Sequence, residues 1–205
     1  CHSSPGNRIA PINVSGSVVT VAAVVAVRRA SLGDVPALSA LIPRSAGALS
    51  AGYYTAAQIA GAIEYVFGVD SALIADGTYL VAEANGEIRG CGGWSRRKTL
   101  YGGDQHKQRA DPLLDPRTDA ARIRAFFVAP EHARQGIGGA LMQGCAEAAF
   151  GAGFRRLELM ATLPGVPLYA AFGFSAVEEV VERLPNGVLI PFVRMKRQLD
   201  GPQIA

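Results

Sequence analysis

The sequence predicts an α/β (α+β) fold with a single mixed, mostly antiparallel sheet of six to seven strands and helices on both faces. Two pairs of β-rich runs flank the turn residues Asn85-Gly86 and Pro185-Asn-Gly187, which is typical of hairpins. Between these pairs, a strand pattern over 121–128 leads through a glycine-rich turn into a helix and then into another strand. Because parallel strands need such a crossover, this segment predicts one parallel βαβ unit.

One strand and two helices are expected before the first hairpin. The strand is expected over residues 18–28, where β-branched residues are frequent. Ser31-Leu-Gly-Asp34 forms a capping pattern that starts a helix, and Pro43 is expected to end that helix, with a flexible stretch over 45–52. A second capping box, Thr55-Ala-Ala-Gln58, starts the next helix.

The later elements follow a hairpin and a long polar segment. Residues 95–118 are polar and too numerous for an ordinary connection, so they are expected to be either disordered or a functional lid. The strands and helices around this segment are predicted from hydrophobic periodicity. They are a hairpin over 79–84 and 87–94, a strand over 121–128, a helix from 137 that Gly151-Ala-Gly153 ends, a strand over 155–161, a helix over 167–172, and a hairpin over 177–183 and 188–197.

Composition and charge exclude two classes of partner. The net charge of +3 is weakly basic, and no stripe of Lys and Arg is interleaved with aromatic residues, so no nucleic-acid partner is expected. No span reaches about 18 unbroken apolar residues, so no membrane association is expected. Residues 1–17 are rich in small polar residues and are expected to be a mobile extension of a single domain over 18–199.

The three cysteines have no metal-binding spacing, and no metal is expected. Cys91 lies in a glycine-rich strand and Cys145 in an apolar helix pattern, so both are interpreted as small core residues. Unpaired core cysteines are typical of a reducing compartment, which favours a cytoplasmic location.

The glycine-rich turn predicts an anion-binding site. Gly136, Gly138 and Gly139 stand at the start of a helix, where backbone N–H groups are unpaired and the helix dipole favours negative charge. The dinucleotide fingerprint fails because Leu141 stands where its third glycine belongs. The phosphate loop of NTPases fails because Ala140 and Leu141 replace its Lys-Ser/Thr pair. A glycine-rich helix start that serves only close packing is the remaining alternative.

Two segments around this turn resemble a known pattern. Val128-Ala-Pro130 followed by Gln135-Gly136-Ile137-Gly138 resembles motif A of the GNAT superfamily, the acyl-CoA-dependent N-acyltransferases, and the resemblance extends over roughly residues 24–198. One position departs from the family pattern: its first Gln/Arg falls on Ala133, with Arg134 one residue later. The resemblance implies a GNAT-like fold, acetyl-CoA as co-substrate, and a coenzyme A site formed by Phe127, Val128, Arg134, Gln135, Gly136, Ile137, Gly138 and Gly139.

A second segment supports the first. Leu168-Tyr169-Ala-Ala-Phe172-Gly173-Phe174 resembles the family's segment near the chain end, in which a tyrosine protonates the leaving thiolate. The resemblance therefore implies that Tyr169 is the general acid. The alternative for Tyr169 is a core aromatic residue with a surface hydroxyl. By resemblance, the backbone N–H of Val128 would stabilise the developing oxyanion, a contribution of ~3–4 kcal/mol.

The general base is unassigned by the sequence. An amine with a pKa of about 10.4 is neutral only about once in 10³ molecules at pH 7, so its deprotonation costs roughly 4–5 kcal/mol. Arg122 stands where some relatives carry a glutamate. Glu158 is the candidate base, and a water chain is the alternative. Glu83, Asp104 and His106 are weaker candidates.

The acceptor site is expected to come from residues outside motif A. Tyr53, Tyr54 and Trp94 are candidate apolar walls. Arg122 and Arg124 alternate with an isoleucine, so both point to one sheet face, where they could pair with a substrate carboxylate or simply flank a helix surface.

These observations favour an N-acyltransferase, most simply one that moves an acetyl group from acetyl-CoA to a primary amine of a small molecule or peptide. The alternative is a non-catalytic acyl-CoA-binding or sensor module of the same fold. A nicotinamide-dependent oxidoreductase is disfavoured by Leu141 and by the single βαβ unit. The expected partners are acetyl-CoA and an unidentified amine, and a homodimer is left open.

Overall fold

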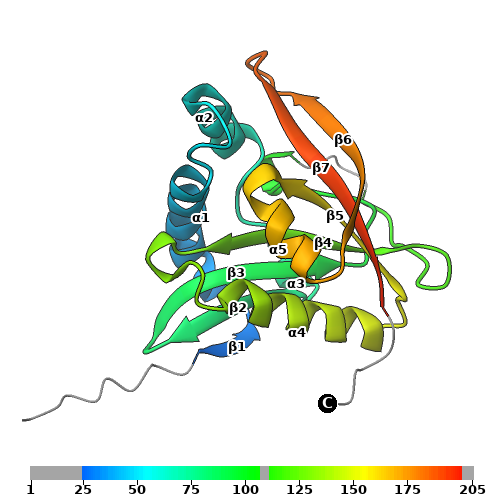
Figure 1. Cartoon of the computed structure of the whole chain (residues 1–205). Helices are drawn as coiled ribbons and strands as arrows, with labels where there is room; N and C mark the ends of the chain where they lie inside the picture. Colours follow the sequence, from blue (N-terminus) through cyan, green and yellow to red (C-terminus); the bar gives the residue numbers. More distant parts are fainter. Residues whose placement is uncertain (1–24, 107–110, 200–205) are drawn as a thin grey trace, which may run out of the picture.

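The computed structural model describes residues 25–106 and 111–199 and contains a seven-stranded sheet (Figure 1). The strand order is β1-β2-β3-β4-β5-β7-β6, and every neighbouring pair is antiparallel except β4 and β5, which are parallel. This arrangement confirms the predicted mixed sheet with one βαβ unit. The strands are β1 (Ala26–Arg29), β2 (Tyr79–Ala84), β3 (Glu87–Ser95), β4 (Ala121–Val128), β5 (Arg156–Thr162), β6 (Ser175–Arg183) and β7 (Leu189–Gln198).

Helices cover both faces of the sheet, as predicted. On one face, Met142 and Cys145 of α4 are fully buried in a cluster with Leu157 of β5. On the other face, Leu38 of α1 and Leu73 of α3 are fully buried against strands β2 and β3. No helix in the described part of the chain is long and apolar enough to cross a membrane. The helices are α1 (Val35–Leu49), α2 (Ala56–Tyr65), α3 (Ser71–Ala75), α4 (Ile137–Gly151) and α5 (Val166–Ala171).

The entry into α1 is fixed by an ion pair and a capping box. The described strand β1 runs to Arg29, whereas the predicted strand residues 18–24 and the predicted extension 1–17 lie outside the described residues. Arg28 pairs with Asp34 at 2.8 Å, and Asp34 also accepts a hydrogen bond from the backbone N–H of Ser31 at 2.7 Å. The Arg28 guanidinium holds the pKa of the Asp34 carboxyl well below its usual range.

The prediction that Pro43 ends the first helix is wrong. Helix α1 continues through Pro43 to Leu49, so the stretch expected to be flexible is mostly helical. Proline in a helix interior removes one hydrogen bond and costs about 3 kcal/mol relative to alanine. The helix continues because its apolar stripe continues: Leu38, Leu41, Ile42, Ser45 and Ala46 are all buried at helical spacing.

Two segments between the predicted elements are ordered by polar contacts. Helix α3 was not predicted, because its five residues carry too little periodicity, and Asp70 caps it by accepting from the N–H of Leu73 at 3.2 Å. In the polar segment 95–118, two arms pair through bonds from Lys98 N to the carbonyl of Pro112 (3.0 Å) and from Leu114 N to the carbonyl of Arg96 (2.8 Å). The tip of this segment, 107–110, lies outside the described residues.

Strands β4 and β5 pair over a short length and then separate. Their parallel register consists of Ala121 with Leu157 and Arg122 with Glu158, although β4 continues to Val128 and β5 to Thr162. Ala125 in β4 has a positive φ of 56°, an unusual conformation for an alanine, at the start of the separated part. The separation opens the sheet between two of its central strands.

Replacing Pro43 with alanine should stabilise the protein. Pro43→Ala restores the missing donor to the Ser39 carbonyl and is expected to raise the free energy of unfolding by about 1–3 kcal/mol in urea titrations. The control is Ala48→Gly, at an exposed position of the same helix, which should lower the free energy of unfolding by about 1 kcal/mol. This control tests whether the assay resolves a difference in helix propensity. A Pro43→Ala variant that is less stable than the parent would contradict this account.

Candidate active site

A cavity of about 650 Å³ lies at the opening between β4 and β5, a volume that suits a small-molecule site. Its walls come from the second half of β4, the end of β5, the start of α4, helix α5, helix α1 and the segment around Gly102. These parts are far apart in the sequence and meet because the two strands separate. The cavity has two ends with different chemistry.

The glycine end of the cavity is formed by Arg134 and by Gly136 to Gly139 at the start of α4. Gly136 is the N-cap residue with φ 83°, a left-handed conformation that favours glycine, and a Cβ there would meet no protein atom within 4 Å. The space beside its backbone is therefore open to a ligand. The first N–H groups of α4 have no partner within the helix, so they are available to an anion.

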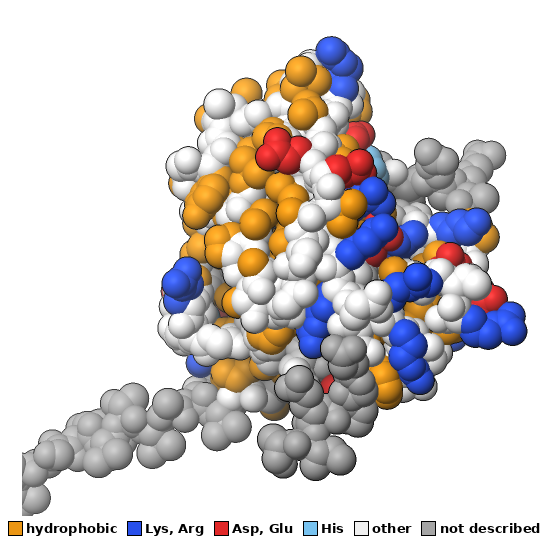
Figure 2. Space-filling view, turned by 45° about the vertical axis from the view of Figure 1, so that its right-hand side comes forward, with side chains coloured by type: hydrophobic (Ala, Val, Ile, Leu, Met, Phe, Trp, Pro, Cys, Tyr) orange, Lys and Arg blue, Asp and Glu red, His pale blue; other side chains and the backbone are white. Residues whose placement is uncertain are grey.

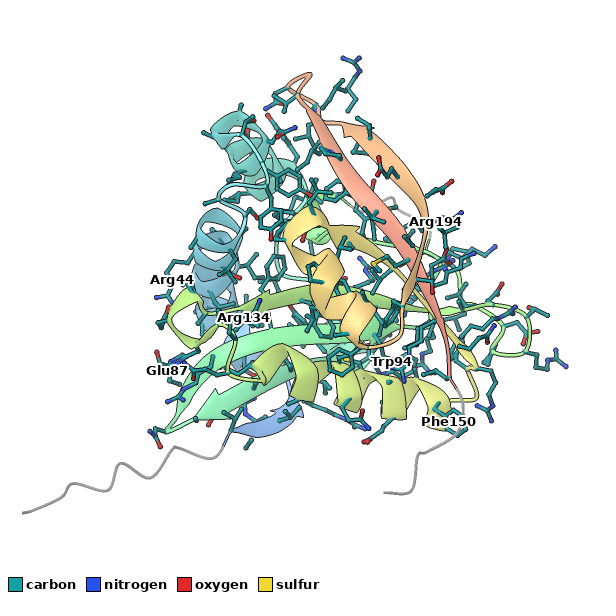
Figure 3. All side chains as sticks on the ribbon, viewed as in Figure 1. Arg44, Glu87, Trp94, Arg134, Phe150 and Arg194 are labelled. Atoms are coloured by element: carbon teal, nitrogen blue, oxygen red, sulfur yellow. The ribbon has the colours of Figure 1, made fainter. Side chains whose placement is uncertain are left out.

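Two glycines of this turn also let α4 approach α5 closely. A Cβ at Gly138 would lie 3.2 Å from Leu168, and one at Gly139 would lie 3.1 Å from Phe172. The packing alternative and the anion-binding prediction are therefore compatible, because the same absence of side chains serves both. Figure 3 shows Arg134 at the turn that leads into α4.

Most residues predicted for coenzyme A line the cavity. Gln135 does not: its side chain is exposed and donates to the carbonyl of Glu131 at 3.2 Å. The residues of that prediction that line the cavity are Phe127, Val128, Arg134, Gly136, Ile137, Gly138 and Gly139. This surface fits an extended ligand that ends in a phosphate. The strand backbone of β4 suits the extended part, and the start of α4, to which it leads, suits the phosphate.

The Val128 N–H meets a hydroxyl that sequence reasoning missed. It donates to Ser45 Oγ of α1 at 3.2 Å, and Ser45 is buried and lines the cavity. The sequence carried no signal for this contact, because Pro43 predicted that the helix would end before Ser45, whereas α1 continues past it and places Ser45 in the cavity wall. A ligand that uses the Val128 N–H has to replace the Ser45 hydroxyl.

Tyr169 is buried and lines the same cavity. Its ring makes edge-to-face contacts with Phe126 at 6.3 Å and with Phe174 at 5.9 Å between centroids. Burial raises the pKa of the Tyr169 phenol above its usual value, and the nearby Cys145 adds to the shift. The phenol is therefore protonated throughout the physiological range, which is the state that a proton donor requires.

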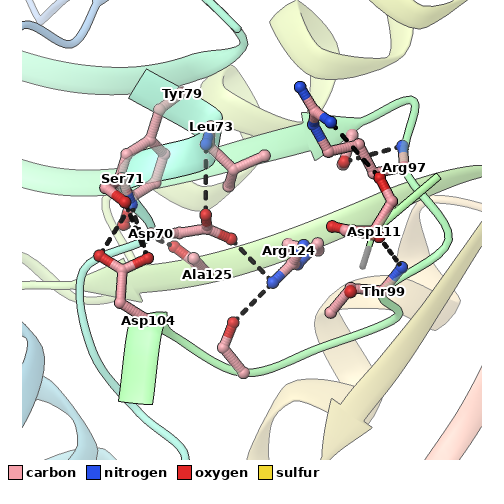
Figure 4. Close-up of polar contacts among 12 residues, drawn as sticks. Asp70, Ser71, Leu73, Tyr79, Arg97, Thr99, Asp104, Asp111, Arg124 and Ala125 are labelled. Carbon is pink, nitrogen blue, oxygen red and sulfur yellow. Dashed lines mark hydrogen bonds and ion pairs between the residues drawn. The ribbon is translucent and has the colours of Figure 1, made fainter. Parts of the chain in front are cut away.

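Arg124 also lines the cavity, but its charge is balanced within the protein (Figure 4). Its Nη2 lies 2.8 Å from the Asp70 carboxylate and donates to the Gly102 carbonyl at 2.6 Å. Both charged side chains are almost completely buried. Burial lowers the pKa of Arg124 below its usual value. Among the described residues, Nε and Nη1 of Arg124 have no hydrogen-bond partner.

Arg122 and Glu158 form a second ion pair, away from the cavity lining. Glu158 is buried and contacts Arg122, Arg194 at 2.9 Å and Lys196 at 3.6 Å. These cations explain why a carboxylate is buried here, and Glu158, the candidate base, does not line the cavity. Arg122 and Arg124 do share a sheet face, yet both guanidinium groups are paired with carboxylates of the protein.

The three predicted apolar walls have different positions. Tyr53 lines the cavity and is half exposed. Tyr54 is buried and connects two elements, since its hydroxyl donates to the Pro191 carbonyl at 2.7 Å and accepts from the Leu163 N–H at 2.9 Å. Trp94 packs edge-to-face on Phe154 in the core under α4, so it is a core residue outside the cavity lining.

The aromatic end of the cavity is formed by residues of one hydrophobic cluster, namely Val66, Phe67, Tyr101, Met160 and Phe192. Among the described residues, no Asp, Glu, His or Lys lines the cavity at either end. Figure 2 shows apolar side chains exposed in the upper half of the molecule, where α2 and the β6–β7 hairpin lie in Figure 1.

The weaker candidates for the base lie outside the lining. Glu83 pairs with Arg28 at 2.6 Å. Asp104 accepts from the N–H of Ser71 at 3.1 Å, and the ring of His106 lies 5.0 Å from that of Tyr101. None of these side chains reaches the cavity surface.

The cysteines and one surface cluster are also separate from the cavity. Cys91 and Cys145 are free and fully buried, and burial raises the pKa of the Cys91 thiol to about 12, in agreement with their interpretation as core residues. Glu87, Glu131 and His132 lie close enough together to hold a metal ion, but none of them lines the cavity. Glu131 already pairs with Arg44 at 2.8 Å.

Comparisons with solved structures show the same fold in several acetyltransferases. A GCN5-related N-acetyltransferase from Rhodopseudomonas palustris has a TM-score of 0.63 at 20% identity, over 85% of this chain and 95% of that one. PaiA N-acetyltransferase from Thermoplasma acidophilum, solved in complex with coenzyme A, has a TM-score of 0.57 at 16% identity, over 85% and 99%. The ribosomal-protein-S18-alanine N-acetyltransferase from Escherichia coli has a TM-score of 0.55 at 14% identity, over 89% and 99%.

None of the curated proteins compared matches this chain. A family model does: the acetyltransferase (GNAT) family matches residues 50–174, which include the long polar segment, β4, the glycine-rich turn and Tyr169. The chain therefore belongs to the GNAT acetyltransferase family.

Proposed function

We propose that this protein transfers an acetyl group from acetyl-CoA directly to a primary amine of a small molecule or peptide. One observation carries the proposal: the same cavity is lined by the glycine end, by the separated backbone of β4 and by the Tyr169 side chain. A glycine-rich helix start suits a pyrophosphate, and an open strand edge suits the amides of a pantetheine arm. The coenzyme A complex of the Thermoplasma acidophilum relative supports this choice of co-substrate.

Each step of the transfer has a group in the cavity except the deprotonation of the amine. Helix α4 holds the phosphates by its first N–H groups, and Phe127 and Val128 hold the pantetheine arm. The Val128 N–H, once it leaves Ser45, donates to the thioester oxygen as negative charge develops there. Tyr169, protonated in the resting protein, donates its proton to the sulfur as the C–S bond breaks, and the resulting phenolate is reprotonated from solvent.

The alternative is a non-catalytic acyl-CoA-binding module. The absence of a carboxylate or imidazole from the described cavity lining is the observation that favours this alternative. Incubation with acetyl-CoA and a panel of amines, followed by mass spectrometry of the products, separates the two functions. The panel contains an amino acid, a polyamine, a peptide N-terminus and 2-phenylethylamine. Coenzyme A binding without acetylation of any amine would reject the enzymatic function.

Tyr169→Phe should remove the proton donor without removing the ring. With the best acceptor of the panel, kcat is expected to fall by about 10²-fold or more, because general acid catalysis of this type contributes 10²–10⁴-fold. The Kd for coenzyme A, measured by calorimetry, should stay within about twofold, since the ring contacts with Phe126 and Phe174 are retained. An unchanged kcat would assign Tyr169 to packing alone.

Gly136→Ala should weaken coenzyme A binding by about tenfold or more, because a methyl group would fill the open space beside the helix start and φ 83° is strained for alanine. Gly86→Ala is the matched control: Gly86 has φ 77° and equally open space, but lies in the β2–β3 turn. Both variants should lose similar stability in thermal unfolding. Equal effects of the two variants on the Kd would contradict a site at the glycine end.

A further inference from the structure

The cavity poses a chemical problem at its aromatic end. The titratable side chains among the described residues of its lining are Tyr53, Tyr101, Arg124, Arg134 and Tyr169. None of these is a conventional base at neutral pH, since a phenol and a guanidinium are both protonated there. An acceptor amine that enters as an ammonium ion needs a route for its proton out of an apolar cavity.

Tyr101 connects the cavity to a carboxylate. Its ring lines the cavity and packs against Phe192 at 5.7 Å, while its hydroxyl donates to Glu182 Oε2 of β6 at 2.7 Å. Both side chains are partly buried. The loop that carries Tyr101 is held against the end of α2 by the bond from Gly103 N to the Val66 carbonyl at 2.8 Å. The phenol thus has a fixed position between the cavity and the outer strand.

The ionic surroundings of Glu182 differ from those of Glu158. Among the described residues, Glu182 forms no ion pair, in contrast to Glu158, which three cations contact. The titratable groups at Tyr101 are Glu182, by hydrogen bond, and His106, whose ring lies 5.0 Å from its own. Burial and the carboxylate both raise the pKa of the Tyr101 phenol, so the phenol passes a proton on rather than holding a negative charge.

We propose that Tyr101 and Glu182 form the proton relay that deprotonates the acceptor amine, an assignment that rests on the proposed acetyltransferase function. A proton of the acceptor ammonium passes to Tyr101 Oη while the phenolic proton passes to Glu182, which releases it to water. The neutral amine attacks the thioester carbon, so a C–N bond forms and the C–S bond breaks. The ammonium loses two protons in total. The relay releases the first to solvent, and the nitrogen releases the second to solvent after the C–N bond has formed, which balances the proton that Tyr169 gives to the sulfur and recovers from solvent.

The relay fits an acceptor whose amine is carried on an apolar body. The aromatic end offers Val66, Phe67, Met160 and Phe192 as contacts, and Arg124 is neutralised by Asp70. Burial of the acceptor in such a site disfavours its charged form and so assists the proton transfer. We therefore expect 2-phenylethylamine to be acetylated more efficiently than an amino acid or a polyamine.

The test compares Tyr101→Phe and Glu182→Gln with matched controls over a range of pH. Tyr101→Phe keeps the ring and removes the relay, and Glu182→Gln keeps a hydrogen-bond acceptor but takes up no proton. With the best acceptor of the panel, each variant should lose about 10²-fold in kcat/KM at pH 7. The loss should shrink as the pH rises toward the pKa of the amine, because a growing fraction then arrives neutral. The Kd for coenzyme A should be unchanged.

The controls are Tyr65→Phe, which breaks another tyrosine–carboxylate contact outside the cavity, and Glu179→Gln on the same strand. Both should retain parental activity at every pH. A Tyr101→Phe variant within twofold of the parent at pH 7, or a loss independent of pH, would overturn the relay. Failure of the parent protein to acetylate any amine would instead reject the proposed function, so the two failures are distinguishable.

Discussion

The short pairing of β4 with β5 is the constraint on which the site depends. The parallel register ends at Arg122 and Glu158, and the side chains of these two residues form an ion pair that joins the strands at this point. Beyond it, the backbone of β4 turns at Ala125, whose carbonyl accepts from Tyr79 Oη at 3.4 Å. On its β5 side, the second half of β4 therefore presents backbone groups to a cavity, while its other side remains paired with β3. An unpaired buried N–H is costly. Ser45 satisfies one of these groups, at Val128.

A buried ion pair fixes the position of this separated strand. Arg124 and Asp70 lie within 2.8 Å of each other at almost no exposure, and the pair joins β4 to the cap of α3 and to the segment around Gly102. Burying two charges is expensive, so such a pair is weak evidence of a gain in stability, whereas its contacts do define an arrangement of three segments. Because Arg124 holds the Gly102 carbonyl, it also positions the preceding residue, Tyr101, beside the cavity. The contacts of Arg124 with the protein also explain why a basic residue on this face need not bind substrate.

The local parts of the fold and of the candidate site could be predicted from the sequence. Turn residues located both hairpins, and the glycines with Val128 and Tyr169 located the elements that line the cavity. The errors arose where packing outweighed a local signal. Pro43 lies within a helix because the buried stripe of α1 extends past it, and Trp94 is a core residue because α4 covers its side of the sheet.

The sequence by itself determined the class of fold, the glycine-rich helix start and the tyrosine segment, since these depend on residue types at fixed local spacing. Only the tertiary structure decided which charged groups are available. Arg122, Arg124 and Glu158 have promising positions along their strands, but partners distant in sequence pair with them. Tyr101 and Glu182 are 81 positions apart and meet only in the folded chain. Ionic and hydrogen-bond partners are set by distance in space, and no local pattern encodes that distance.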